Sequence, residues 1–120
     1  MKVLIIDDDA DIRFVAAMSL RAGGAIDVVE ASGGLDGIGK AREERPDVIL
    51  LDMMMPLMDG AQMIAALRKQ KETATTPVIF LTAKTIVAEI QGMKDLGAAG
   101  VLIKPFDPRT LAADVLALLR

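Results

Sequence analysis

The fold is decided by the stretch from residue 46 to residue 60, which reads Pro46-Asp47-Val48-Ile49-Leu50-Leu51-Asp52-Met53-Met54-Met55-Pro56-Leu57-Met58-Asp59-Gly60. Four consecutive aliphatic residues, Val48 to Leu51, lead directly into Asp52. Such a short apolar run is typical of a strand buried on both faces, as in a parallel sheet covered by helices. Pro56 and the Asp59-Gly60 pair then indicate a loop. Asp52 is therefore expected where a buried strand meets a loop, either as a helix cap or as a reactive carboxylate.

Length and composition narrow the class of protein. The 120 residues predict one domain, residues 1–120, with a core that needs no disulfide. Cys and His are absent, which excludes a thiol nucleophile and leaves any phosphohistidine chemistry to a partner. A net charge of −3 and only three aromatic residues give no reason to expect direct nucleic-acid binding. No apolar segment approaches the ~20 residues of a membrane span and no signal peptide is evident, so we expect a cytoplasmic protein without membrane attachment.

Apolar runs and helical patterns alternate along the whole chain. Strands are expected at 3–6, 26–31, 48–51, 78–81 and 101–103, and helices near 11–21, 32–44, 60–70, 86–96 and 108–119. The run at 26–31 alternates in polarity, as an edge strand does. The last helix is expected to have Asp107 as its N-cap and Pro108 as its first residue. Five strand–helix units predict an α/β fold, a doubly wound parallel sheet with right-handed crossovers.

Polar side chains follow four of the five apolar runs. They are Asp7 and Asp8 after the first, Asp52, Thr82 and Lys104. Ligands of open α/β sheets bind outside the carboxyl ends of the strands, so these side chains are candidate site residues. The opposite ends carry no comparable set: they carry Lys2, Asp47, Pro77 and Gly100. Asp47 lies five residues before Asp52, roughly 17 Å away along a strand, and is expected to be a solvated strand-start residue.

The negative charges of carboxylates that lie close together need to be compensated. Two like charges ~4 Å apart repel by about 4 kcal/mol at an effective dielectric constant of 20. Either a pKa rises or a cation binds, and an all-oxygen site suits a hard divalent ion such as Mg²⁺. The three negative charges of Asp7, Asp8 and Asp52 would be balanced by the metal ion and Lys104. Such a site would accept a dianionic phosphoryl group, with the Thr82 hydroxyl as a donor.

Each residue also has an ordinary interpretation. Asp9 and Asp11 are expected to cap the first helix or lie in its first turn, and Asp7 and Asp8 could do only the same. Thr82 could be a turn residue and Lys104 a solvated lysine. The methionines at 53, 54, 55 and 58 are interpreted as packing and loop residues. The joint placement of the polar residues at neighbouring strand ends favours a site.

The chain resembles the receiver domains of response regulators in two-component signalling, including the chemotaxis regulators, over nearly its whole length. The matching stretches are Val3-Leu4-Ile5-Ile6-Asp7-Asp8-Asp9, Asp47 to Gly60, Pro77-Val78-Ile79-Phe80-Leu81-Thr82-Ala83 and Gly97 to Phe106. The resemblance implies a flavodoxin-like (βα)5 sheet of strand order 2-1-3-4-5. It also implies a phosphorylation-dependent signalling switch, not an enzyme in the ordinary sense, that promotes its own phosphorylation and dephosphorylation.

The resemblance assigns a role to each site residue. Asp52 would be the phosphoacceptor, taking a phosphoryl group from the phosphohistidine of a histidine kinase or histidine phosphotransfer protein. Thr82 would reach the phosphoryl group in the active state, and Lys104 would pair with its oxygens. The Lys104–Pro105 peptide bond would be cis. Mg²⁺ (or Mn²⁺) would be held by Asp8 directly, by Asp7 through water, by Asp52 and by the backbone carbonyl of Met54.

One position departs from the family pattern. Three residues before Lys104 the family usually carries Tyr or Phe, whereas this chain has Val101, and Phe106 does not replace it by position. We therefore expect the switch to depend on Thr82 and the loop after it. The helix 4–strand 5–helix 5 face is the family's usual dimer surface, so a weak homodimer through it is a further expectation. Met54 and Lys84 are expected to shield the acyl phosphate from water.

Three other functions remain as alternatives. The domain could be an unphosphorylated receiver that serves only as an interaction module. Asp7-Asp8-Asp9-Ala10-Asp11 overlaps the Asp-x-Asp start of aspartate-nucleophile phosphohydrolases, with Asp7 as the nucleophile. A flavin-binding module would need a phosphate loop and stacking aromatics that the sequence lacks. If the chain is part of a longer protein, a downstream effector, DNA-binding or other output domain would follow.

Overall fold

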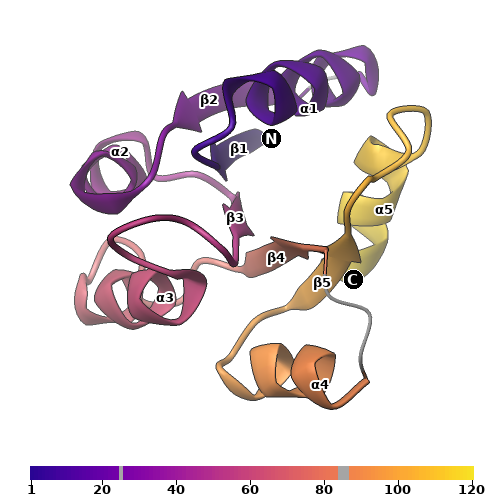
Figure 1. Cartoon of the computed structure of the whole chain (residues 1–120). Helices are drawn as coiled ribbons and strands as arrows, with labels where there is room; N and C mark the ends of the chain where they lie inside the picture. The colour runs from indigo at the N-terminus through magenta and orange to yellow at the C-terminus, as the bar shows by residue number, and fades with distance from the viewer. Residues whose placement is uncertain (25, 84–86) are drawn as a thin grey trace.

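The computed structural model describes residues 1–24, 26–83 and 87–120 (Figure 1). Strands and helices alternate strictly along these residues. In chain order they are β1 (Lys2–Ile6), α1 (Ala10–Ala22), β2 (Asp27–Ala31), α2 (Gly34–Glu44), β3 (Val48–Asp52), α3 (Gly60–Lys69), β4 (Val78–Thr82), α4 (Val87–Asp95), β5 (Gly100–Ile103) and α5 (Leu111–Leu118). The described helices include none that is long and apolar enough to cross a membrane.

The five strands form one parallel sheet in the order β2-β1-β3-β4-β5. This confirms the predicted flavodoxin-like α/β fold and its strand order. β2 lies at one edge, as its alternating sequence predicts, and β1, β3 and β4 lie inside the sheet, where their near-continuous apolar runs are buried on both faces. The order reverses between β1 and β3, which pair directly, and this reversal marks where ligands bind in such sheets.

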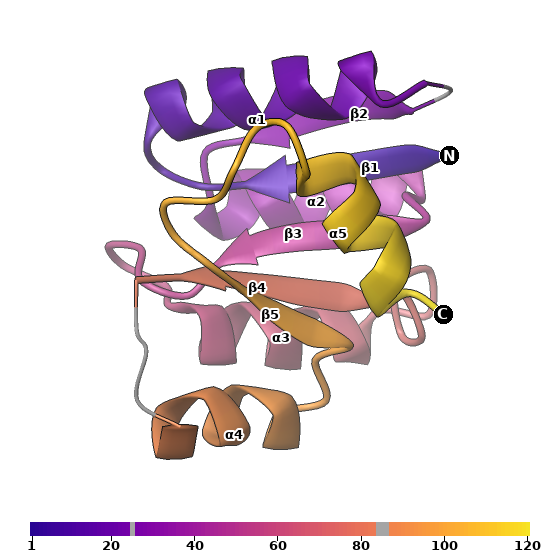
Figure 2. The ribbon, with the colours of Figure 1, turned by 90° about the vertical axis from the view of Figure 1, so that its right-hand side faces the viewer.

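Helices cover both faces of the sheet. Alternate residues of the strands point to opposite faces, so Leu4 and Ile6 belong to one buried cluster and Val3 and Ile5 to the other. Figure 1 shows α1 and α5 together on one face and α2, α3 and α4 on the other. Figure 2, turned by 90°, shows α1 and α5 from their own side.

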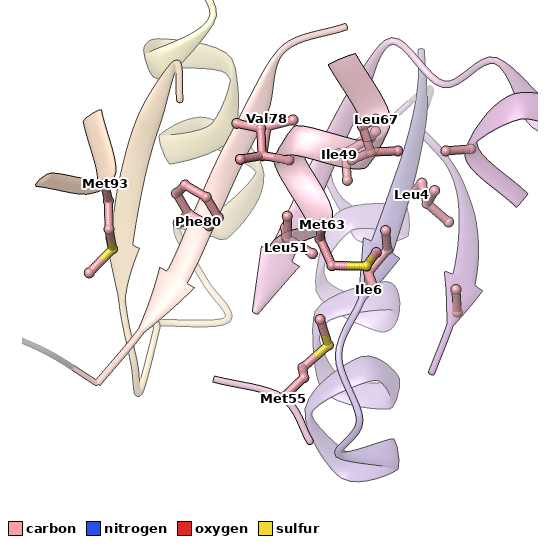
Figure 3. Close-up of a cluster of buried hydrophobic side chains, with 13 residues drawn as sticks. Leu4, Ile6, Ile49, Leu51, Met55, Met63, Leu67, Val78, Phe80 and Met93 are labelled. Atoms are coloured by element: carbon pink, nitrogen blue, oxygen red, sulfur yellow. The ribbon is translucent and has the colours of Figure 1, made fainter. Parts of the chain in front are cut away.

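The cluster under α2, α3 and α4 is drawn in Figure 3. Phe80 of β4 and Met63 of α3 are fully buried in it, and Met93 is the α4 residue that closes it. Val101 of β5 is only partly buried and packs against this same cluster. The residue at the family's usual aromatic position is therefore a small aliphatic side chain beside the contact of α4 with the sheet.

Two helix starts differ from the predictions. α5 begins at Leu111, and Pro108 to Thr110 form a turn. The Asp107 carboxylate does accept the backbone N–H of Arg109 (2.9 Å), but it caps this turn, which Thr110 N closes on Asp107 O (3.1 Å), and the N-cap of α5 itself is Thr110. α2 begins two residues after the predicted Ser32, because Gly33 has φ of 116°, outside the right-handed helical region, and so serves as the N-cap.

The start of α1 matches its prediction. Asp9 is the N-cap, and its carboxylate accepts from the N–H groups of Asp11 (2.9 Å) and Ile12 (3.4 Å). The acidic residue Asp11 lies in the first turn, where the helix dipole favours it. These two acidic residues therefore serve the helix, whereas Asp7 and Asp8 lie before it.

Candidate functional site

The carboxyl ends of four strands bring the predicted site residues to one edge of the sheet. Asp7 follows β1, Asp52 and Thr82 end β3 and β4, and Lys104 follows β5. Backbone hydrogen bonds continue the sheet to this edge: Asp7 N to Ala31 O (3.1 Å), Met53 N to Leu81 O (3.0 Å) and Lys104 N to Thr82 O (2.7 Å). The site therefore has a rigid backbone frame.

Asp7, Asp8 and Asp52 form an acidic cluster at this edge. One carboxylate oxygen of each lies within 4.8 Å of the others. Asp7 is fully buried and Asp52 is 4% exposed, whereas Asp8 is exposed to solvent. Three carboxylates at this spacing repel one another strongly. The donor set is all oxygen and open on the side of Asp8, so it fits a hard divalent cation that keeps part of its water shell, such as Mg²⁺.

Lys104 is the cation that the fold itself supplies. Its Nζ lies 2.8 Å from Asp7 Oδ2 and 3.3 Å from Asp52 Oδ1. Burial alone favours the neutral amine, but the hydrogen bond and charge of Asp7, together with those of Asp52, raise the pKa of Lys104 above its ordinary value. One lysine charge is thus shared by two buried carboxylates, which leaves the cluster with a surplus of negative charge. The Lys104–Pro105 bond is cis, as the resemblance implies.

The environment of Asp52 perturbs its pKa, as is typical of a reactive carboxylate. Burial, followed by the charge of Asp7, raises its pKa to about 6, and Lys104 and the backbone N–H of Met54 offset only part of this. Asp52 Oδ1 accepts that N–H at 3.3 Å. Lys104 and the Met54 N–H therefore both contact Oδ1, and Asp52 carries its charge at neutral pH despite its burial.

The loop between β3 and α3 is packed tightly beneath the site. Gly60 N donates to Met53 O (2.9 Å), and a β-carbon at residue 60 would lie 2.8 Å from Phe80 Cε1 and 2.9 Å from Met53 Cα. Only glycine fits there. Asp59 then starts α3 with a capping box formed with Gln62. These contacts hold the backbone that leads away from Asp52.

The remaining predicted residues take the following places. Thr82 is 1% exposed at the end of β4, the strand beside β3. Met54 has an exposed side chain, and the role of its carbonyl as a metal ligand stays a prediction. Lys84 lies outside the described residues, so the shielding hypothesis also stays a prediction. Asp47 lies at the opposite edge, where it accepts the backbone N–H of Lys2 at 2.7 Å, and it takes no part in the cluster.

Two features of the site were missed by the sequence reasoning. Arg13 reaches back from α1, and its Nη1 donates to the backbone carbonyl of Asp7 at 2.7 Å. Leu57 has φ of 70°, at the centre of a turn closed by Met58 N and Pro56 O (2.8 Å), and its side chain is fully exposed. An arginine in a helical pattern reads as a solvated residue, and nothing about a leucine in a loop signals a left-handed backbone.

Comparisons with known proteins agree with this geometry. The family model of the response regulator receiver domain matches residues 3–116. The chain is 42% identical over 120 residues to the DNA-binding dual master transcriptional regulator RpaA of Synechocystis sp., covering 99% of this chain and 49% of that protein. It is 39% identical to the alkaline phosphatase synthesis transcriptional regulatory protein PhoP of Bacillus subtilis, covering 99% of this chain and 48% of the relative. The chain thus spans about half the length of the curated relatives it matches.

A solved structure of a response regulator has the same fold over nearly the whole chain. The chemotaxis response regulator CheY4 of Vibrio cholerae superposes with a TM-score of 0.89 at 37% identity, covering 98% of this chain and 97% of that one. The strand order, the acidic cluster and the lysine at the end of β5 are in place in the present chain. The chain belongs to the receiver domains of response regulators, the phosphorylation-dependent signalling domains of two-component systems.

Proposed function

We propose that this receiver domain is switched by phosphorylation of Asp52, with a phosphohistidine of a histidine kinase or histidine phosphotransfer protein as the donor. The observation that carries the proposal is the acidic cluster, in which a single lysine is shared by two buried carboxylates. That surplus negative charge is costly unless a divalent cation and a phosphoryl group use it. Phosphoryl transfer depends mainly on such positioning and charge neutralisation.

In this mechanism Asp52 is the nucleophile. One of its carboxylate oxygens attacks the phosphorus in line with the phosphorus–nitrogen bond of the donor. That bond breaks, the electron pair leaves with the imidazole, and an aspartyl phosphate forms. The pKa of about 6 keeps Asp52 ionised at neutral pH, so attack needs no general base. Lys104 already contacts Asp52 Oδ1 and can turn to an oxygen of the incoming phosphoryl group.

The same residues support a metal ion. Asp8 would bind Mg²⁺ (or Mn²⁺) directly and Asp7 through water, with Asp52 and the Met54 carbonyl as further ligands. When bound, the ion supplies neutralisation of the negative charge on the cluster and on the phosphoryl oxygens. Asp7 is unsuited to be the nucleophile of a phosphohydrolase, because it is fully buried and its oxygens accept from Asp9 N and Lys104 Nζ.

The output step differs from the family's usual one at Val101. We expect Thr82, buried one strand from Asp52, to donate to a phosphoryl oxygen and so to draw the end of β4 and the loop after it toward the site. Backbone chemical shifts with and without a beryllofluoride phosphoryl mimic measure this. The largest changes are expected at Thr82 and in the loop that follows, and a large side-chain rotation around Val101 would contradict the expectation.

Partner and output are proposed from the surface and the relatives. Phe14 and Met18 on α1 are 65% and 55% exposed, and they offer an apolar surface for a donor protein near the edge that bears the site. The curated relatives are about twice as long and are named as transcriptional regulators, so a separate effector or a fused output domain would receive the signal. A weak homodimer through α4, β5 and α5 and a cytoplasmic location complete the proposal.

Intact-mass spectrometry tests the proposal. Wild-type protein with acetyl phosphate and Mg²⁺ is expected to gain one phosphoryl group, and to gain none when EDTA removes the metal. Asp52→Asn should abolish the gain, whereas Asp47→Asn, five residues earlier and just before β3, should keep it. If wild-type protein never gains the group from acetyl phosphate or from a phosphorylated donor protein, the domain is an interaction module and the proposal is wrong.

A further inference from the structure

Arg13 joins the start of α1 to the ends of two strands. Its Nη1 donates to the backbone carbonyl of Asp7 at 2.7 Å, and its Nε lies 3.5 Å from Glu30 Oε1 on β2. Only 19% of the Arg13 side chain is exposed. A guanidinium has several donors in a rigid plane, so one side chain can hold a carbonyl and a carboxylate at the same time.

The carbonyl that Arg13 holds belongs to the peptide unit between Asp7 and Asp8. A peptide unit is planar, so fixing the direction of its C=O also fixes its N–H and the backbone from which Asp8 begins. The Asp7 carboxylate has other anchors, since its Oδ1 accepts from Asp9 N (2.9 Å) and its Oδ2 from Lys104 Nζ (2.8 Å). A change at Arg13 would therefore act mainly on the placement of Asp8.

We propose that Arg13 is a positioning residue of the metal site, which holds the Asp7–Asp8 peptide so that the exposed Asp8 carboxylate stays within reach of Asp7 and Asp52. The inference rests on the proposed function, because it assumes that the acidic cluster binds a divalent cation. Residues that orient metal ligands through hydrogen bonds typically change metal affinity by 10- to 100-fold when they are lost.

Charge and positioning make opposite predictions for Arg13. A positive side chain near the acidic cluster repels a cation, so removal of its charge alone would strengthen Mg²⁺ binding. Loss of the hold on the Asp7 carbonyl would instead weaken Mg²⁺ binding, because Asp8 would no longer be fixed. The sign of the change in affinity therefore distinguishes the two effects.

The chain offers a matched control on the same helix. Arg21 lies two turns further along α1, and its Nη2 donates to the backbone carbonyl of Val28 at 3.3 Å. Arg21→Met removes the same charge and the same kind of hydrogen bond, but away from the acidic cluster. Glu30→Gln weakens the hold on Arg13 without removing Arg13 itself.

Isothermal titration with Mg²⁺ on the full chain tests the proposal, with thermal unfolding in EDTA as a measure of folding. Arg13→Met is expected to raise the Mg²⁺ dissociation constant about 10-fold. Arg13→Lys, which keeps the charge and can still reach a carbonyl, should recover part of the loss. Glu30→Gln should weaken binding by less than Arg13→Met, and Arg21→Met should leave the dissociation constant unchanged. Asp8→Asn serves as the control that removes a proposed ligand.

Equal or tighter Mg²⁺ binding by both Arg13 variants would overturn the proposal while the metal site itself stands. The same loss of affinity in Arg13→Met and Arg21→Met would also overturn it, because the effect would then be one of general stability. If wild-type protein fails to bind Mg²⁺, the proposed metal site and this inference fall together. If Arg13→Met does not fold, the comparison of Arg13→Lys with Arg21→Met decides.

Discussion

β3 carries an aspartate at each of its ends, and the fold treats the two differently. Asp47, just before the strand, is exposed and accepts the backbone N–H of Lys2 at 2.7 Å. The Lys2 side chain in turn pairs with Glu44 at 3.2 Å. Asp52, at the other end, is buried beside Asp7 and Asp8, and it shares Lys104 with Asp7. Its pKa rises to about 6.

The two edges differ in whether the negative charges are compensated by groups of the protein itself. At the amino edge Asp47 and Glu44 each have a partner within the chain and stay in contact with water, where an ion pair adds about 0–1 kcal/mol. At the carboxyl edge the fold places more negative charge than it compensates, at a cost in stability. Sites at which stability is sacrificed in this way are typically functional.

The largest effect is expected from removal of the carboxyl-edge lysine. Lys104→Met takes away the cation that would follow charge onto the phosphoryl group, so we expect phosphorylation of Asp52 by acetyl phosphate to slow about 100-fold. It also leaves Asp7 and Asp52 without their shared partner, which should lower the free energy of unfolding by about 3 kcal/mol without metal.

Lys2→Met is the matched variant at the amino edge. It removes one lysine whose partner Glu44 stays solvated, so phosphorylation should be unchanged and stability should fall by no more than about 1 kcal/mol. Rates come from intact-mass time courses and stabilities from urea unfolding. Equal effects of the two substitutions would show that the two edges do not differ as described.

The next effect is the pH dependence of the free energy of unfolding, which should differ between variants of Asp52 and Asp47. In the folded state the pKa of Asp52 is raised to about 6 from the ordinary value of 3.8, so the folded protein holds this proton more tightly than the unfolded chain. The Asp52 contribution to stability is therefore fully present below pH ~4 and is lost as the pH rises through about 6. At pH 7 the loss is on the order of 2–3 kcal/mol.

Asp52→Asn removes this cost. In metal-free buffer we expect it to raise the free energy of unfolding by about 2 kcal/mol at pH 7, with the gain shrinking toward pH ~4. Asp47→Asn should give no gain, because it weakens the contact with Lys2 N. Urea unfolding at several pH values measures both variants. A gain for Asp52→Asn that does not depend on pH would contradict the explanation.

The smallest effect concerns two residues whose backbone has a left-handed conformation, one near each edge of the sheet. Leu57 has φ of 70° in the loop after Asp52, and Arg45 has φ of 47° at the end of α2. Both side chains are exposed, so glycine at either position should relieve backbone strain without loss of packing and add about 1 kcal/mol of stability.

The two glycine variants should differ in function. Leu57→Gly loosens the loop that leads from the site to α3, so we expect its rate of phosphorylation to change measurably, whereas Arg45→Gly should keep the wild-type rate. Thermal unfolding and mass time courses provide the comparison. A loss of stability in Leu57→Gly would show that the leucine side chain makes a contact that outweighs the strain.

Much of the fold follows from local patterns. The short apolar runs identify the strands because a buried parallel strand needs apolar residues on both faces, and β1, β3 and β4 supply them. The meeting of Asp7, Asp8, Asp52 and Lys104 was expected because parallel strands end at one edge, and the structure brings these four together. The predicted start of α5 at Pro108 is wrong because Thr110 N bonds to Asp107 O, which closes a turn, and the helical spacing begins only with the bond from Asp114 N to Thr110 O.

The contacts that support the site could not be predicted from the sequence. Arg13 contacts Asp7 and Glu30 only because α1 packs across the ends of β1 and β2, which no spacing along the chain reveals. The pKa of Asp52 depends on how deeply the strand end is buried and on a lysine 52 residues away, so only the folded structure shows its direction.

The most direct test is to locate the phosphoryl group. Protein treated with acetyl phosphate and Mg²⁺ is reduced with borohydride, which converts an aspartyl phosphate to homoserine, and is then digested and sequenced by tandem mass spectrometry. The account predicts homoserine at position 52, only when Mg²⁺ is present, and unmodified Asp47 in the same peptides. Homoserine at Asp7 or Asp8, or modification that continues in EDTA, would contradict it.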